Sequence, residues 1–425
     1  MGPPLAADTG FHFGDPWAVG LAFLGLAVFA AIGALSHEHE RAFSASLIYL
    51  GLGVVAAVAV GLLELGWLDP LEDARLVEHV TELAVVIALF STGLKLDRAL
   101  RWRDWSTVTR LLVIGMPVFI ALAALFGVAV MGLSVGAAIV LAAALAPTDP
   151  VLAGDIGVGP PGDEDEHEPH FGISAEAGFN DGLAFPFVLL GLVIADKAGG
   201  VEWALADLVY AIGAGLVVGA AMGYAIAALM VRLRDSELLI PALDGWVAVA
   251  ATLAIYGVAE VLGTYGFLAV FAGGLAFRRY EHDHELNGRV HDGAEIVEKF
   301  GELAVILLLG SMLTLDGLGA PGLAGWGLVL LVIFLLRPVT VNLALLGSRL
   351  QRPGERAFLA WFGVRGVGTL FYVATAAAVG SPLPRDEREI VVWTAIACVV
   401  VSIAVHGVTA GPLKRWLGEN VLTRA

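Results

Sequence analysis

The residues best able to do chemistry inside an apolar protein lie together near the middle of the chain. The stretch Ser174-Ala-Glu-Ala-Gly-Phe-Asn-Asp-Gly182 leads directly into the apolar segment 183–195. On a helix, Glu176 and Asn180 share one face, and Asp181 lies beside them. Ionised groups in hydrocarbon are unfavourable and normally face a partner or a wet cavity. A helix start capped by Ser174 is the alternative, but Asn180 and Asp181 lie too far along for capping.

Two further stretches place charge beside helix-breaking residues. Ala146-Pro-Thr-Asp-Pro150 sets Asp149 between two prolines, and Gly363-Val-Arg-Gly-Val-Gly368 sets Arg365 among three glycines. Proline has no N–H, so carbonyls one turn earlier are expected to lose their helical partners, while glycine permits unwinding. Freed carbonyls and a carboxylate suit a monovalent cation, and Arg365 could offset the carbonyl-end dipoles. Two ordinary kinks are the alternative.

The composition indicates which class of protein holds these residues. Hydrophobic residues make up 58% of the 425, only 15% are charged, and the mean hydropathy is +0.83. Repeated apolar runs of spanning length predict an all-α polytopic protein embedded in the lipid bilayer. The net charge of −17 argues against nucleic acid as a partner. The single Cys398 excludes an internal disulfide framework, and no cofactor is expected.

The apolar pattern predicts about thirteen transmembrane segments. Their approximate ranges are 17–36, 45–66, 78–97, 108–131, 134–154, 173–195, 204–231, 238–261, 264–280, 296–315, 322–348, 355–380 and 388–411. Basic residues concentrate in alternate loops, which predicts an N-terminus outside and a C-terminus in the cytoplasm. Acidic residues with no Lys or Arg before the first segment disfavour a cleavable signal peptide. The chain is expected to form one transmembrane domain, embedded over 17–411, with a short cytoplasmic tail at 412–425.

An internal repeat relates the third and tenth segments. Residues 82–97, beginning Glu-Leu-Ala-Val-Val, are similar to residues 302–316, beginning Glu-Leu-Ala-Val-Ile. The two segments are an odd number apart, so they cross the membrane in opposite directions, which is typical of secondary transporters. The same offset relates 146–150 to 363–368, so segments five and twelve are expected to be broken helices that cross. Chance similarity of two apolar helices is the alternative.

Arg337 is the membrane charge most in need of a partner. It interrupts the apolar run 328–346 directly before Pro338. Burying an unpaired Arg is unfavourable, so Glu176 is expected to pair with it. Extension of the side chain to the cytoplasmic surface is the alternative.

Three charged loops invite a metal or pH-sensing role. The acidic loop 162–170 contains His167 and His170, which could sense pH. The stretches 280–285 and 37–40 combine His with acidic residues, but the latter lacks the second His of an H-E-x-x-H zinc site. Solvated connectors explain all three more simply.

Three motifs, in this order, resemble those of NhaP-type sodium/proton antiporters of the monovalent cation:proton antiporter superfamily: Ala146-Pro-Thr-Asp-Pro150, Glu176 with Asn180-Asp181, and Gly363-Val-Arg-Gly366. The similarity covers roughly residues 17 to 411. It implies a homodimer whose protomers each have a dimerisation bundle and a moving core containing the crossed broken helices. It also implies secondary active exchange of a monovalent cation for a proton, with a part in pH homeostasis.

The resemblance implies a role for each motif residue. Asp181 would bind the cation and the proton by turns, because a carboxylate away from bulk water holds a proton tightly and cannot hold both well. Asp149 and the backbone of Thr148 would complete the ion site. Asn180 would steady segments five and six. It occupies the place of a second Asp in electrogenic relatives, which implies an electroneutral cycle.

The resemblance also implies that Glu176 pairs with a membrane arginine, Arg337 in preference to Arg365. Two departures affect the expected ion preference. Ala177 stands where several relatives have an ion-binding serine, and Ser91 stands where relatives often have Glu in an L-F-E-G-G-L pattern. Na⁺ is the expected cation, with K⁺ or Li⁺ left open.

Two functions from other classes remain as alternatives. A cation channel could use the same acidic cluster, but no T-V-G-Y-G filter pattern occurs in the sequence. An intramembrane aspartyl protease could use Asp149 and Asp181, but no G-x-G-D motif occurs, and the protein is not expected to be an enzyme.

Overall fold

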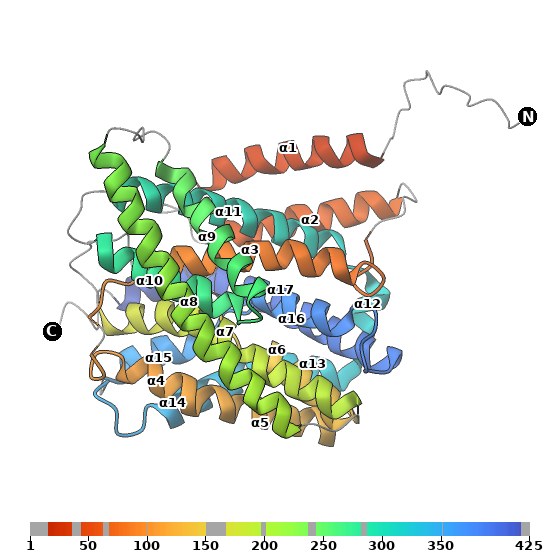
Figure 1. Ribbon diagram of the computed structural model, residues 1–425. Coiled ribbons are helices and arrows are strands. Elements are labelled where there is room, and N and C mark those ends of the chain that lie inside the picture. Colours follow the sequence, from red (N-terminus) through yellow and green to blue (C-terminus); the bar gives the residue numbers. More distant parts are fainter. Residues whose placement is uncertain are drawn as a thin grey trace, which may run out of the picture.

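The computed structural model describes residues 16–35, 44–62, 68–99, 101–149, 167–196, 201–236, 244–281, 287–350 and 352–417. Every regular element in these ranges is a helix, and many of the helices run alongside one another, with α8 crossing obliquely in front (Figure 1). This confirms the all-α fold class.

No β-strand occurs within the described ranges. The helices, in chain order, are α1 Pro16–Leu35, α2 Ala45–Leu62, α3 Ala74–Lys95, α4 Ser106–Arg110, η2 Leu111–Gly115, α5 Met116–Ala129, α6 Val135–Ala144, α7 Glu168–Asp196, α8 Val201–Asp235, α9 Asp244–Val261, α10 Gly266–Glu281, α11 Asn287–Ser311, α12 Leu315–Gly319, α13 Gly322–Leu331, η5 Val332–Leu336, α14 Arg337–Ala344, α15 Pro353–Trp361, α16 Val367–Ala377 and α17 Arg385–Leu417.

Each of the thirteen expected segments contains a described helix, although the ends differ by several residues. Within the described ranges, 8 helical units are long and apolar enough to cross a membrane, judged by length and composition. The apolar helices α6 and α16 are shorter, because α6 ends at a break in the chain's helical path and α16 begins after one. The multi-pass architecture is therefore supported, while the count of thirteen crossings stays a prediction.

Two single-turn π-helices interrupt long units, and proline explains both. η2 ends before Met116 and Pro117, and η5 ends before Arg337 and Pro338. Because proline cannot donate an N–H, the preceding turn widens: the N–H of Met116 bonds to the carbonyl of Leu111, five residues back. The Arg337 N–H bonds in the same way to the Val332 carbonyl. The two units are an odd number of segments apart, which supports the internal repeat.

Small residues bring α6 and α7 close together. A methyl group at Gly136 would lie 2.7 Å from the carbonyl oxygen of Gly191, and one at Gly191 would lie 2.8 Å from the carbonyl oxygen of Gly136. Paired glycines let helix backbones approach in a membrane, where apolar surface alone does not drive association. The Ser134 hydroxyl caps the start of α6 by accepting the N–H of Ala137. These contacts set the position of the chain that follows α6 against the middle of α7.

Candidate ion site

Two interrupted helices meet near the centre of the protein. α6 ends at Ala144, and the chain continues without helical structure to Asp149, the last residue described before 167. α15 ends at Trp361, and α16 begins at Val367 after a non-helical stretch. The breaks fall within the two predicted motifs, 146–150 and 363–368. The continuation of the first helix beyond Asp149 lies outside the described residues, so the full crossing stays a prediction.

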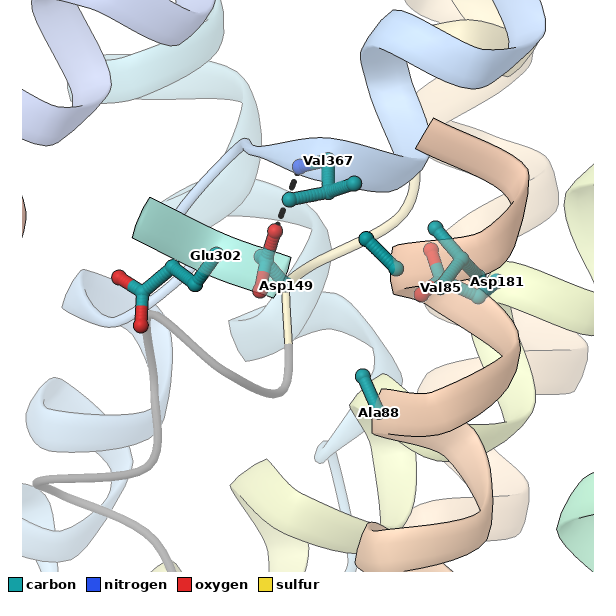
Figure 2. A pocket seen from close by; sticks show the side chains of 7 residues that line it. Val85, Ala88, Asp149, Asp181, Glu302 and Val367 are labelled. Carbon is teal, nitrogen blue, oxygen red and sulfur yellow. Dashed lines mark hydrogen bonds between the residues drawn. The ribbon is translucent and has the colours of Figure 1, made fainter. Parts of the chain in front are cut away.

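Asp149 joins the two breaks by two hydrogen bonds. Its backbone N–H donates to the carbonyl oxygen of Val364 at 2.9 Å. Its Oδ2 accepts the N–H of Val367 at 2.6 Å, which Figure 2 shows as a dashed line. Val367 is the first residue of α16, so the carboxylate lies at the positive end of that helix dipole. Asp149 thus links the two breaks through its backbone N–H and caps the start of α16 with its carboxylate.

At the first break, the carbonyl of Ala143 loses its helical partner as expected, because Pro147, four residues on, has no N–H. The further expectation that this carbonyl is left free to bind an ion is wrong. The carbonyl accepts the N–H of Ala146 at 3.2 Å, because the helix tightens as it ends. This carbonyl is therefore engaged in the chain's own turn.

Asn180 connects the first break to α7. Its Oδ1 accepts the backbone N–H of Thr148 at 3.2 Å, and its Nδ2 donates to Thr148 Oγ1 at 2.8 Å. Both sides of the amide are used, and both residues are buried. The sequence resemblance implied this bridging position. α7 begins at Glu168, so Ser174 lies inside the helix, and the alternative of a cap at Ser174 is wrong.

Asp181 is buried beside this bridge with part of its carboxylate unsatisfied. The residue is 2% exposed, and its Oδ1 has no hydrogen-bond partner among the described residues. A methyl group at Gly368 would lie 2.3 Å from that oxygen, so the start of α16 presses directly on the carboxylate. The hydroxyl of Tyr372, one turn further along α16, donates to the backbone carbonyl of Asp181. A buried carboxylate oxygen without a donor is suited to hold a proton or a cation.

Three acidic residues are among those that line a small cavity of about 10 Å³, which is near the lower limit for one water molecule. Figure 2 shows six of its seven lining residues by name, with Asp149 between Glu302 on one side and Asp181, beside α3, on the other, and with the Glu302 carboxylate pointing away from both. The full lining is Ala84, Val85, Ala88, Asp149, Asp181, Glu302 and Val367. Four helices, α3, α7, α11 and α16, therefore contribute to one space together with the first break.

Glu302 was not expected at the site. The sequence marked it only as the first residue of a repeat in an apolar helix. The residue lines the cavity from α11, and its carboxylate accepts the hydroxyl of Ser46 at 2.5 Å. No sequence motif places α11 beside the two breaks, so only tertiary packing reveals this residue. Ser91, where relatives often have Glu, donates its hydroxyl to Glu298, a second acid of α11.

Glu176 and Arg337 form the buried ion pair expected from the sequence. The two guanidinium nitrogens reach the two carboxylate oxygens at 2.5 and 2.7 Å, and Arg337 Nη2 also donates to the Leu359 carbonyl at 3.3 Å. Both side chains are less than one tenth exposed. The bidentate pairing holds α7 to the first residue of α14, and the alternative of extension to the surface is wrong.

Arg365 lies in the second break without a carboxylate partner among the described residues. Its Nη1 donates to the Gly363 carbonyl at 2.6 Å, its guanidinium lies 5.1 Å from the centroid of the Phe119 ring, and its backbone N–H donates to Ser402 at 2.8 Å. The side chain is almost fully buried. The positive charge of Arg365 beside a non-helical carbonyl agrees with the expectation that this residue offsets the carbonyl dipoles of the second break.

The charged loops remain largely outside the described residues, which include neither 37–40 nor 282–286 nor 150–166. Where the acidic loop becomes α7, Glu168 pairs with Arg98 at 2.5 Å, and the rings of His167 and His170 lie 6.4 Å apart. No group of three or more His, Cys, Asp or Glu residues that could hold a metal ion occurs in the described part of the chain.

Comparisons with known proteins agree with this geometry. The family model for the sodium/hydrogen exchanger, transmembrane, matches residues 24–416. Na(+)/H(+) antiporter 2 of Zygosaccharomyces rouxii is 28% identical over 401 residues, covering 85% of this chain and 49% of that protein. K(+)/H(+) antiporter NhaP of Alkalimonas amylolytica is 27% identical over 254 residues, covering 59% of this chain and 42% of that protein. The chain thus spans half or less of the length of these two relatives.

A solved structure shares the fold. The sodium proton antiporter MjNhaP1 from Methanocaldococcus jannaschii at pH 8 superposes with a TM-score of 0.74 at 18% sequence identity, covering 95% of this chain and 100% of that one. The likeness extends over nearly the whole of both chains, as the sequence motifs predicted. With the match over residues 24–416, it follows that the chain belongs to the transmembrane sodium/hydrogen exchanger family.

Proposed function

We propose that the protein is a secondary antiporter that exchanges Na⁺ for H⁺ across a membrane at Asp181. The observation that carries the proposal is the buried Oδ1 of Asp181, which has no hydrogen-bond partner among the described residues and belongs to a side chain lining a cavity shared with Asp149. Burial disfavours a free carboxylate anion, so this group is best satisfied by a proton or a cation. Membership of the sodium/hydrogen exchanger family supports ion transport as the purpose of this carboxylate.

Competition at one carboxylate couples the two ions. A proton on Asp181 weakens its attraction for a cation, and a bound cation favours the ionised form. If only the loaded forms reorient between the two faces of the membrane, each cation moved in one direction is matched by a proton in the other. Alternating access of this kind needs no covalent step, and it is the mechanism that we infer for this site.

The neighbouring residues have supporting roles in the proposal. Asp149, with the backbone of Thr148, completes the ion site, and Asn180 holds these residues against α7 through its two bonds to Thr148. Asn180 is uncharged, so Asp181 is the one group of this pair that exchanges a proton, which favours one cation per proton and an electroneutral cycle.

The charged pair and the buried arginine hold the scaffold in the proposal. Glu176 and Arg337 tie α7 to α14, and Arg365 balances the carbonyls of the second break. Two protomers form a homodimer with the N-terminus outside and the C-terminus in the cytoplasm, and the embedded region forms a single transport domain. These parts of the proposal rest on the sequence motifs and on the distribution of basic residues.

Potassium is the second candidate cation. The relative from Alkalimonas amylolytica is named as a K(+)/H(+) antiporter, and Ala177 and Ser91 replace two groups that several relatives have near the ion. A cation channel is a rival from another class, and proton-coupled, saturable flux distinguishes an antiporter from it. The proposed function includes no enzymatic reaction.

The test uses purified protein in liposomes that enclose a pH-sensitive dye. Sodium, potassium and lithium are added in turn to wild type and to Asp181→Asn. Cation-driven proton movement in wild type that is lost in the variant supports exchange at Asp181 and ranks the ions. Equal proton movement in the variant removes Asp181 from the ion site. If the folded wild type shows uncoupled cation flux instead, the channel replaces the antiporter.

A further inference from the structure

The hydroxyl of Tyr372 meets the backbone of the residue that is proposed to bind the ion. The side chain belongs to α16, is fully buried, and donates its hydroxyl to the main-chain carbonyl of Asp181. This carbonyl lies in the turn of α7 that precedes Pro186, where the missing N–H of proline removes a helical hydrogen bond. A buried tyrosine hydroxyl needs a partner, and here the partner is the peptide that carries the Asp181 side chain.

α16 therefore contacts Asp181 at two points. Gly368 lies against the carboxylate, and Tyr372, four residues later on the same face of the helix, holds the carbonyl. The first contact limits where the carboxylate can lie. The second fixes the peptide of Asp181, and with it the direction in which the side chain leaves α7.

A second tyrosine hydroxyl supports the first. The hydroxyl oxygens of Tyr265 and Tyr372 lie 3.3 Å apart. Each tyrosine hydroxyl has one hydrogen, and that of Tyr372 is given to the carbonyl of Asp181, which can only accept. Tyr265 is therefore the donor in the tyrosine pair. A hydroxyl that accepts one hydrogen bond is polarised and donates a stronger one, so Tyr265 strengthens the bond from Tyr372 to Asp181.

Tyr265 is itself held by other helices. It directly precedes α10, and its backbone N–H donates to the carbonyl of Ala211 in α8 at 3.0 Å. A β-carbon at Gly215 of α8 would lie 2.7 Å from the Tyr265 carbonyl oxygen, so the two backbones are in close contact. The ring of Phe185, from α7, stacks on the Tyr265 ring with centroids 4.9 Å apart and planes 10° apart. The Tyr265 hydroxyl is thus fixed in direction.

We propose that Tyr372 is a positioning residue for Asp181, and that Tyr265 acts on the ion site through the hydroxyl of Tyr372. The inference rests on the proposed exchange function and adds two residues that set the geometry of its site without touching the ion. The cavity has no lining residue from α8 or α10 in the described part of the chain. The two hydroxyls couple those helices to the peptide of Asp181.

The test compares the Na⁺ dependence of exchange in wild type, Tyr372→Phe, Tyr265→Phe and Tyr210→Phe. Phenylalanine keeps each ring and removes only the hydroxyl. Losing one hydrogen bond is expected to raise the Na⁺ concentration for half-maximal exchange about tenfold in Tyr372→Phe, with a maximal rate close to that of wild type. Tyr265→Phe is expected to raise it about threefold. Tyr210, on α8, is 58% exposed, so its variant is the control and is expected to match wild type.

The double variant Tyr265→Phe with Tyr372→Phe tests whether the two hydroxyls act in series. If Tyr265 acts only through Tyr372, the double variant is expected to match Tyr372→Phe alone. Independent effects that multiply would overturn the role given to Tyr265. A lower maximal rate with an unchanged half-maximal Na⁺ concentration in Tyr372→Phe would overturn the positioning role, because loss of folded protein alone produces that result.

A binding measurement separates this inference from the proposed function. Na⁺ is expected to raise the unfolding temperature of detergent-solubilised wild type, and to do so only at about tenfold higher concentration in Tyr372→Phe. Equal Na⁺ dependence of this shift in the two proteins would overturn the inference. If wild type binds Na⁺ without coupled exchange, the exchange function fails while the shift still decides the role of Tyr372. If neither Na⁺, K⁺ nor Li⁺ shifts wild type, the inference fails together with the ion site.

Discussion

Gly368 and Asp181 are in direct contact, although 187 residues separate them in the sequence. A β-carbon at position 368 would lie 2.3 Å from Oδ1 of Asp181, closer than real atoms approach. The second break therefore needs glycine at this position for a reason beyond backbone freedom. Its lack of a side chain leaves room for the carboxylate that is proposed to bind the ion.

Gly368→Ala is expected to abolish exchange without unfolding the protein. The methyl group forces the Asp181 carboxylate aside, and a displacement of about 1 Å at a reacting group can lower a rate about 100-fold. Proteoliposome exchange assays measure the loss. Gly213→Ala is the matched control, because a β-carbon there meets nothing within 4 Å. Wild-type exchange in Gly368→Ala would contradict the ion-binding role of Asp181.

Two substitutions of Asp149 separate its charge from its hydrogen bond. Asn keeps an oxygen that can accept the Val367 N–H, whereas Ala leaves that buried N–H unsatisfied. Asp149→Asn is expected to weaken cation binding with little loss of stability. Asp149→Ala is expected to lose about 1–3 kcal/mol of stability in addition. Thermal unfolding and Na⁺-dependent exchange measure the two effects. If the two variants unfold at the same temperature, the hydrogen bond from the Val367 N–H to the Asp149 carboxylate does not contribute significantly to stability.

Breaking the buried pair is expected to destabilise the protein strongly. Arg337→Ala leaves Glu176 charged and buried, which costs about 3–5 kcal/mol. The double variant Glu176→Gln with Arg337→Met is expected to be more stable than Arg337→Ala alone, since no unpaired charge remains. Denaturation of the purified protein in detergent gives both values.

The exposed pair of Arg385 and Glu72 is the control for that comparison. Its side chains are 75% and 70% exposed. Arg385→Ala is expected to change stability by at most about 1 kcal/mol, because solvent screens the interaction. Equal losses from the buried and the exposed pair would show that burial does not govern the energy of the Glu176–Arg337 contact.

Competition at Asp181 also predicts the direction of the pH dependence. Lowering the pH raises the fraction of protonated carboxylate, so the Na⁺ concentration for half-maximal exchange is expected to rise. For strict one-to-one competition, the rise approaches about tenfold for each unit of pH. Exchange rates recorded over a Na⁺ series at several pH values measure it. A half-maximal concentration that stays constant across pH would argue for separate proton and cation sites.

Charge movement tests the stoichiometry. With Asn180 uncharged beside Asp181, exchange is expected to produce no current and to be insensitive to an imposed membrane potential. Proton flux is recorded with and without a potassium diffusion potential in the liposomes, using a sodium gradient as the driving force. Acceleration by the potential would show that more than one proton accompanies each cation.

Local chemistry explains which parts of the site could be predicted from the sequence. The sequence predicted an ion pair between Glu176 and Arg337, because a buried charge without a partner is unfavourable in a membrane. The structure shows the two side chains in a bidentate contact. The break at 147–149 follows from proline, and the break before Val367 follows from three glycines. Asn180 and Asp181 were recognised because they are polar residues at helical spacing.

Tertiary packing explains what the sequence could not predict. Glu302 lines the cavity only because α11 packs against α3 and α16, and the N–H of Val367 meets Asp149 only because the breaks adjoin. The Ala143 carbonyl gained a local partner because the chain tightened into a turn, which proline spacing alone does not specify. The apolar helices were easier to predict, because each depends on a single apolar run.

The reciprocal bonds of Asp149 have a mechanical consequence. Its N–H and its carboxylate engage Val364 and Val367, one on each side of Arg365, so the two broken helices are fastened at two points. Neither can slide past the other without releasing both bonds. In the proposed function, any movement that carries the ion across the membrane should therefore move these two helices together as one rigid body, relative to the helices around them.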